Sequence, residues 1–141
     1  MRMIPTIDSS DAAAAREAGV RAASERGISA CIAVVDSSGV LLELHRSDAA
    51  KAHAVDFATR KARSAALLGL ETAVFERMVK EGRSLTGEVL ALAGGVPIVH
   101  EGRCAGAVGV SGGSSDADHE IAVAAAKATL NEIADKRSDC G

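Results

Sequence analysis

Two stretches of the sequence carry side chains that could perform acid–base or anion-binding chemistry. The first, residues 45–63, follows a segment of alternating polar and apolar residues and continues into a helical pattern. The second begins with a glycine pair, residues 112–113, ahead of a helix start that is rich in acidic residues. Imidazoles and carboxylates can act as general bases, whereas arginine and lysine hold anions. If the protein is an enzyme, we expect His53 and Asp48 to be its catalytic residues. The candidate ligand-binding residues are His45, Arg46, Lys61, Arg63, Gly112, Gly113, Asp118 and His119.

The segment 109–113 fits the G-x-S-x-G pattern of serine hydrolases. That chemistry needs an acid and a histidine from separate later loops, but only about 30 residues follow the serine. The next candidates, Asp118 and His119, are neighbours on one predicted helix. We interpret the segment as a turn that brings backbone close to a ligand or to another strand. An anion site at the helix start is the alternative, although Asp116 and Glu120 already compensate the helix dipole there.

The sequence contains no zinc signature and no site for covalent haem attachment. The four histidines, at 45, 53, 100 and 119, form no H-E-x-x-H motif, and no C-x-x-C-H is present. Cys31, Cys104 and Cys140 are odd in number and widely spaced, so we expect reduced thiols, the first two of them buried. No metal site is therefore predicted, but a single histidine could still approach a haem iron.

A polar stripe runs along the helix predicted over residues 50–68. Helical spacing places His53, Asp56, Arg60 and Arg63 on one side, opposite a face of alanines, with Lys61 at the border. The stripe is either a solvated face or part of a ligand site. Lys61 must either extend to solvent or find a carboxylate partner.

Hydrophobic periodicity and turn residues predict the elements that position these groups. Two β-hairpins are expected, turning at Ser37-Ser38-Gly39 and at Glu101-Gly102. Hairpins imply antiparallel pairing, so we predict an α+β fold of order α-β-β-α-α-β-β-α. The expected elements are a helix capped by residues 8–11 and ending at Gly27, strands 28–36 and 40–45, helices 50–68 and 71–80, strands 96–99 and 104–111, and a helix with a capping box at Ser115 and Asp118 that runs to about residue 136, before a frayed tail. Residues 82–93 receive no assignment.

Composition limits the function classes. The 141 residues are 48% hydrophobic but only 1% aromatic, so small side chains must fill the core of a single domain, 1–141. Such a chain gains from burying apolar surface against copies of itself, and we expect a homo-oligomer. The net charge of −3 offers no basic face for nucleic acid, and no window is apolar enough for a membrane. With no secretory signal, we expect a cytoplasmic protein.

The sequence resembles the GlcG/HbpS family, which also includes the C-terminal domain of PduO-type proteins. The resemblance implies an antiparallel sheet flanked by helices, in a profilin-like or PAS-like layered architecture, assembled into oligomers. It also implies binding of haem or a related small molecule. The matching segments are residues 32–36 with Gly39, Arg46 with Asp48, Asp56 with residues 61–65, residues 94–98, Gly102, residues 106–113 and Asp118.

Function stays open between three hypotheses. In a haem- or tetrapyrrole-binding protein, an arginine or lysine would receive the ligand's carboxylates and one of His45, His53 or His119 would lie near the iron. In a cofactor-independent isomerase, lyase or hydrolase, the ligand would be a small carboxylate. The third hypothesis is a purely structural or interaction module. The family's Met-Asp-Gly-Ala reads Ser-Asp-Ala-Ala at 47–50 here, which favours a changed ligand. In each ligand-binding case we expect a small, anionic ligand where the loop after the second strand, the start of the second helix and Gly112-Gly113 meet.

Overall fold

The structure, a computed structural model, describes residues 1–85 and 87–140 and follows the predicted order of elements. In this part of the chain four helices alternate with two β-hairpins, which confirms the α+β class. The elements are α1 (Ser9–Glu25), β1 (Cys31–Asp36), β2 (Leu41–Arg46), α2 (His53–Leu68), α3 (Thr72–Lys80), β3 (Gly95–His100), β4 (Arg103–Ser111) and α4 (Ser115–Cys140).

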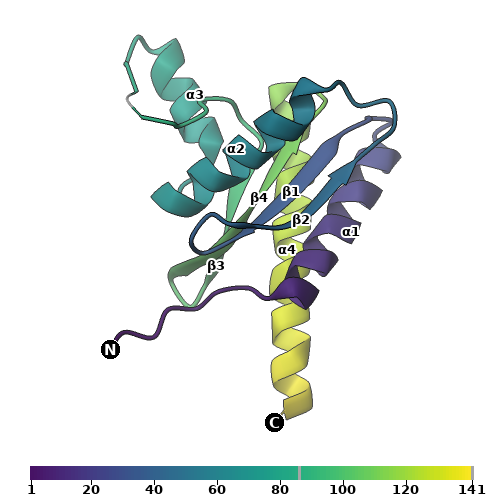
Figure 1. The fold of residues 1–141 in the computed structure, drawn as a ribbon, viewed down its shortest axis with the longest axis vertical. Coiled ribbons are helices and arrows are strands. Elements are labelled where there is room, and N and C mark those ends of the chain that lie inside the picture. Colours follow the sequence, from purple (N-terminus) through teal and green to yellow (C-terminus); the bar gives the residue numbers. More distant parts are fainter. Residues whose placement is uncertain (86, 141) are drawn as a thin grey trace.

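The strands form one antiparallel sheet in the order β2-β1-β4-β3. Helices α1 and α4 pack together on one face, while α2 crosses β1, β4 and β3 on the other (Figure 1). The result is three layers, with β2 and β3 as the edges of the sheet. None of the helices in residues 1–85 and 87–140 combines the length and apolarity needed to cross a bilayer.

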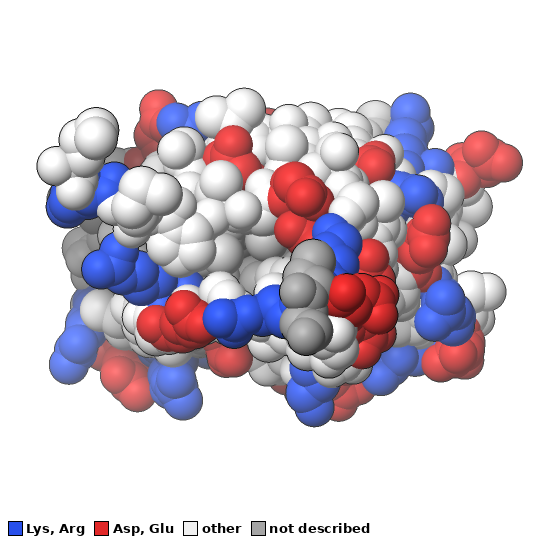
Figure 2. Space-filling view, turned by 90° about the horizontal axis from the view of Figure 1, so that it is seen from below, with Lys and Arg blue, Asp and Glu red and all other residues white. Residues whose placement is uncertain are grey.

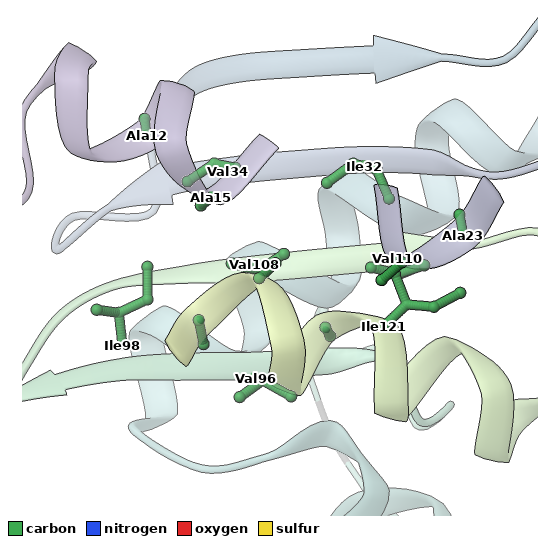
Figure 3. Close-up of a cluster of buried hydrophobic side chains, with 14 of the residues drawn as sticks. Ala12, Ala15, Ala23, Ile32, Val34, Val96, Ile98, Val108, Val110 and Ile121 are labelled. Carbon is green, nitrogen blue, oxygen red and sulfur yellow. The ribbon is translucent and has the colours of Figure 1, made fainter. Parts of the chain in front are cut away.

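Side chains of different size fill the two faces of the sheet. Under α1 and α4 the buried cluster is rich in isoleucine and valine, including Ile32, Val108 and Ile121 (Figure 3). Under α2 it consists almost entirely of alanines. Gly109 of β4 allows this close approach, because a Cβ there would overlap the carbonyl oxygen of Ala58 and lie 2.6 Å from the backbone nitrogen of Ala62.

Helix ends follow the predicted capping chemistry at α1 but not at α4. Asp8 caps α1, and its side chain and that of Asp11 bond reciprocally to each other's backbone N–H. The capping box predicted at Ser115 and Asp118 is wrong. Ser114 caps α4 instead, since its Oγ accepts from the Ala117 N–H at 3.2 Å.

Three other expectations concerned residues 82–93, the C-terminal tail and the burial of the cysteines. Within the described residues of 82–93 there is no helix or strand, which explains why the pattern gave no assignment. The predicted frayed tail is wrong as far as the structure describes it, because α4 continues to Cys140; Gly141 lies outside the described residues. Cys31 is buried as expected, whereas Cys104 is only half-buried.

Candidate functional site

A cavity of about 490 Å³ opens at the end of the sheet where α2 and α4 begin. Its walls come from residues 27–29 before β1, the loop before α2, the first turns of α2, and the turn between β4 and α4. This volume lies in the range typical of small-molecule sites. The residues that matter most for its chemistry are Lys51, His53, Phe57, Lys61, Gly113 and Asp118.

A buried ion pair forms the floor of the cavity. The Lys61 Nζ lies 3.2 Å from Oδ2 of Asp118 and donates to the carbonyl oxygen of Val110 at 2.9 Å. The side chains of Lys61 and Asp118 are only 3% and 4% exposed. Gly94 leaves room for the ammonium, because a Cβ at this position would lie 3.0 Å from Nζ. The helix α2 thus places its border lysine inward, against the start of α4.

The ion pair leaves one donor for a ligand. A lysine ammonium carries three N–H groups, and among the residues that the structure describes two of them are used, by Asp118 and Val110. Lys61 also lines the cavity, so its remaining N–H is available to an oxygen acceptor inside it. An unpaired buried donor is unfavourable, which makes a carbonyl or carboxylate oxygen the natural occupant of this position.

The glycine turn before α4 is held by the protein itself. The Gly113 N–H donates to Oδ1 of Asp118 at 2.8 Å, so the carboxylate occupies the place that an external anion would take. Gly112 has a φ of +151°, and a Cβ there would lie 2.5 Å from the Ser29 carbonyl oxygen. The turn therefore approaches another backbone segment, one of the two possibilities that the sequence left open.

The mouth of the cavity is lined by an imidazole beside an aromatic ring. His53 is exposed at the first turn of α2 and meets Phe57 edge to face, with ring centroids 4.9 Å apart and an interplanar angle of 69°. Lys51, also exposed, adds a cation. Apolar walls thus end in a titratable group and a positive charge at the opening.

Comparison with known proteins places this geometry in a family. The family model described as "Haem degrading protein HbpS-like" matches residues 7–127. The chain belongs to the HbpS-like family. Protein GlcG of Escherichia coli is 44% identical over 97 residues, which is 67% of this chain and 72% of GlcG.

Two solved structures are similar over most of the HbpS-like chain. A double mutant of Streptomyces reticuli HbpS has a TM-score of 0.83 and 31% identity, covering 90% of this chain and 89% of that one. A PduOC:Heme complex has a TM-score of 0.80 and 25% identity, covering 87% and 94%. The resemblance read from the sequence is thereby confirmed.

Half of the candidate site residues line this cavity in the HbpS-like fold. They are His53, Lys61, Gly112, Gly113 and Asp118. The other five, His45, Arg46, Asp48, Arg63 and His119, lie outside its lining. The cavity itself lies where the loop before α2, the start of α2 and the glycine turn meet.

Strand pairing and helix length explain why three of the candidate residues lie outside the cavity lining. His45 pairs with Ile32, whose side chain belongs to the cluster under α1 and α4. Arg46 is exposed and pairs with Cys31, where burial raises the pKa of the thiol and the nearby guanidinium lowers it in part. Arg63 comes about 15 Å further along α2 than His53, close to the turn between β1 and β2.

The other two candidates have different surroundings. Asp48 is exposed in the loop between β2 and α2. His119 places Nε2 3.8 Å from a carboxylate oxygen of Glu71, and its Nδ1 is buried without a hydrogen-bond partner among the described residues. It lies beside the N-terminal end of α3 rather than at the cavity.

Sequence reasoning missed several lining residues. Ile28 and Leu92 carry no chemical signal, but Phe57 is one of only two phenylalanines in the chain and could have been noticed. Ser115 also lines the cavity and donates to Oε1 of Glu76 at 2.6 Å. Burial acts to raise the pKa of Glu76, but hydrogen bonds such as the one from Ser115, together with nearby positive charge, outweigh it and hold that pKa below its usual value.

Proposed function

We propose that this protein binds haem or a related tetrapyrrole in the cavity, with His53 beside the metal. The observation that carries the proposal is the position of the histidines: of the four in the chain, only His53 is among the described residues that line the cavity. A neutral imidazole at the mouth of a pocket is a common haem ligand.

The lining residues are of the chemical types that a tetrapyrrole needs. Ile28, Phe57 and Leu92 supply apolar contacts for a macrocycle. Lys51 at the mouth and Lys61 at the floor can receive its carboxylates. When bound, the iron would supply one-electron and oxygen chemistry, while the protein would provide orientation and charge. The family description and the PduOC:Heme complex support this ligand class.

Haem titration with histidine variants tests the proposal. We expect a saturable Soret shift in the wild type and its weakening in His53→Ala, because this change removes the imidazole at the cavity. His45→Ala and His119→Ala are matched controls, since neither residue lines the cavity, and both should bind like the wild type. A wild type without a saturable shift, or equal binding by His53→Ala and the controls, would contradict the proposal.

A small carboxylate is the second candidate ligand, as substrate of a cofactor-independent enzyme. The buried pair of Lys61 and Asp118 favours it, because the cavity floor presents an ammonium group to which a carboxylate oxygen can bind. His53 would be the general base and Lys61 would hold the anion. A panel of hydroxy- and oxo-acids, screened by NMR against the wild type and Lys61→Met, would identify an acid that binds through Lys61, with circular dichroism to verify that the variant is folded at the temperature used. If Lys61→Met bound every acid that the wild type binds, this second candidate function would be contradicted.

The proposal includes the setting in which the protein acts. We expect residues 1–141 to work as one domain in a cytoplasmic homo-oligomer, a view supported by the free thiols of Cys31 and Cys104 and by the single sheet that the helices cover. We expect no nucleic-acid partner. On the face drawn in Figure 2, acidic and basic side chains are interspersed rather than gathered into a basic patch.

A further inference from the structure

The two edge strands of the sheet differ in their capacity to accept another strand. β3 contains Pro97, which has no N–H to offer to a further strand. Proline is one of the usual means of protecting an edge. β2 contains no proline, and among the described residues only β1 pairs with it. Its register against β1 shifts at the extra residue Leu42, but the segment from Glu43 to Arg46 pairs regularly. The edge open to a further strand is therefore β2.

Hydrogen bonding to β1 shows which groups of β2 face outward. The Ser47 N–H donates to the Ala30 carbonyl oxygen at 3.1 Å, just beyond the end of the strand. In an antiparallel ladder, hydrogen-bonded pairs alternate, so His45 and Glu43 also direct their backbone groups toward β1. Leu44, between them, points its N–H and C=O away from the sheet.

The side chain of Leu44 is also left uncovered. It pairs with Ala33, whose side chain belongs to the cluster under α2, but α2 crosses β1, β4 and β3 and leaves β2 bare on this face. As a result Leu44 is 37% exposed and Leu41 is 43% exposed. Exposed leucines on an edge strand that lacks proline mark it as a place where a partner can bind.

We propose that β2 pairs antiparallel with β2 of a second copy, with Leu44 on the two-fold axis, so that one sheet continues through both subunits. This inference rests on the proposed homo-oligomer and names its interface. In this register each Leu44 exchanges both backbone hydrogen bonds with its counterpart. Each His45 then faces Glu43 of the partner subunit, which gives complementary cross-strand pairs on the face that also holds Arg16, 3.5 Å from Glu43.

Charge disfavours the neighbouring registers. Sliding the strands by two residues in one direction sets the two Glu43 carboxylates opposite each other. The opposite slide sets the two His45 rings face to face, and these repel when protonated. Like charges directly opposite are unfavourable in a sheet. The sequence of β2 is therefore self-complementary about Leu44, which favours a second copy over an unrelated peptide.

Cysteine cross-linking tests the register. Leu44→Cys would set two thiols on residues whose Cα atoms lie about 5.5 Å apart in such a pair, within the range for disulfides. We use a background with Cys104→Ser and Cys140→Ser, because Cys31 is buried. Val99→Cys, at 45% exposure on the other edge, is the matched control. Mild oxidation should yield covalent dimers with Leu44→Cys only; equal yields would overturn the register.

Sedimentation equilibrium tests the interface itself. Leu44→Lys places two charges at the axis and loses the burial of both leucines, so we expect dimerisation weaker by on the order of 100-fold or more. Val99→Lys should associate like the wild type, and circular dichroism would verify that both variants fold. A monomeric wild type would overturn the homo-oligomer and this interface together. An oligomer that Leu44→Lys leaves intact would overturn this interface alone.

Discussion

Replacing Lys61 by methionine tests whether the buried ion pair at the floor of the cavity stabilises the fold. Methionine keeps most of the length of the side chain but removes the ammonium. Asp118 would then stay 4% exposed with only the Gly113 N–H as a partner. The carboxylate has little access to solvent, although it lines the floor of the cavity. The variant therefore isolates the effect of leaving a buried charge without its counter-ion.

The expected loss is large for a domain of this size. Breaking a buried ion pair by removing one partner costs about 3–5 kcal/mol. Domains are stable by only about 5–15 kcal/mol, so the melting temperature should fall by about 10–15 °C. Replacing both partners is much less costly, because no buried charge remains. Lys61→Met/Asp118→Asn should therefore regain at least half of the loss, since asparagine can still accept from Gly113.

Chemical denaturation with a matched control measures these differences. Lys51→Met removes an exposed lysine from the same cavity, and its unfolding free energy should differ from that of the wild type by less than about 1 kcal/mol. If Lys61→Met were as stable as Lys51→Met, the ion pair would contribute nothing. If the double variant were no more stable than Lys61→Met, the unpaired carboxylate would not be the cause of the loss. Either result would contradict the role assigned to the ion pair of Lys61 and Asp118.

Three further variants probe the close packing in the core and the contact of α3 with α4. Gly109→Ala should cost about 3 kcal/mol or more in denaturant unfolding, because its Cβ meets the backbone of Ala58. Gly19→Ala should cost less, because its Cβ meets only side-chain atoms of Ile32, at 3.0 Å. Glu76→Gln should lose about 1 kcal/mol at pH 7. Since the pKa of Glu76 is lowered from 4.5 on folding, this difference should be full above that value and vanish as the pH falls through the folded pKa; a pH-independent difference would contradict it.

The helices and strands could be predicted from the sequence because the residues that signal each of them lie close together in the chain. The helical period of α2 identified Ala58 and Ala62 as its buried face, and both are fully buried. The turn at Glu101 and Gly102 was also predictable, and both residues have the positive φ of a tight hairpin turn. The capping box at α4 failed because Ser114 and Ser115 are both good caps, and only the contact of Ser115 with Glu76 decides between them.

The site was less predictable because it depends on contacts distant in sequence. Lys61 could be placed at a border, but its burial depends on Asp118, 57 residues later. His45 could not be assigned to a face, since the register of β2 shifts opposite Val34 and Val35 and breaks the simple alternation of the strand. His53 was found because it starts a helix at the end of the sheet, where ligands often bind.

The alanine layer under α2 also affects how stability depends on temperature. The heat capacity of unfolding rises with the apolar area that becomes exposed, and alanines expose little each. A core half built from Ala33, Ala58, Ala62 and their neighbours should therefore give a smaller heat-capacity change than the usual value of about 12–15 cal/mol/K per residue. A smaller change flattens the stability curve, so this fold should lose stability slowly on both cooling and warming from its optimum.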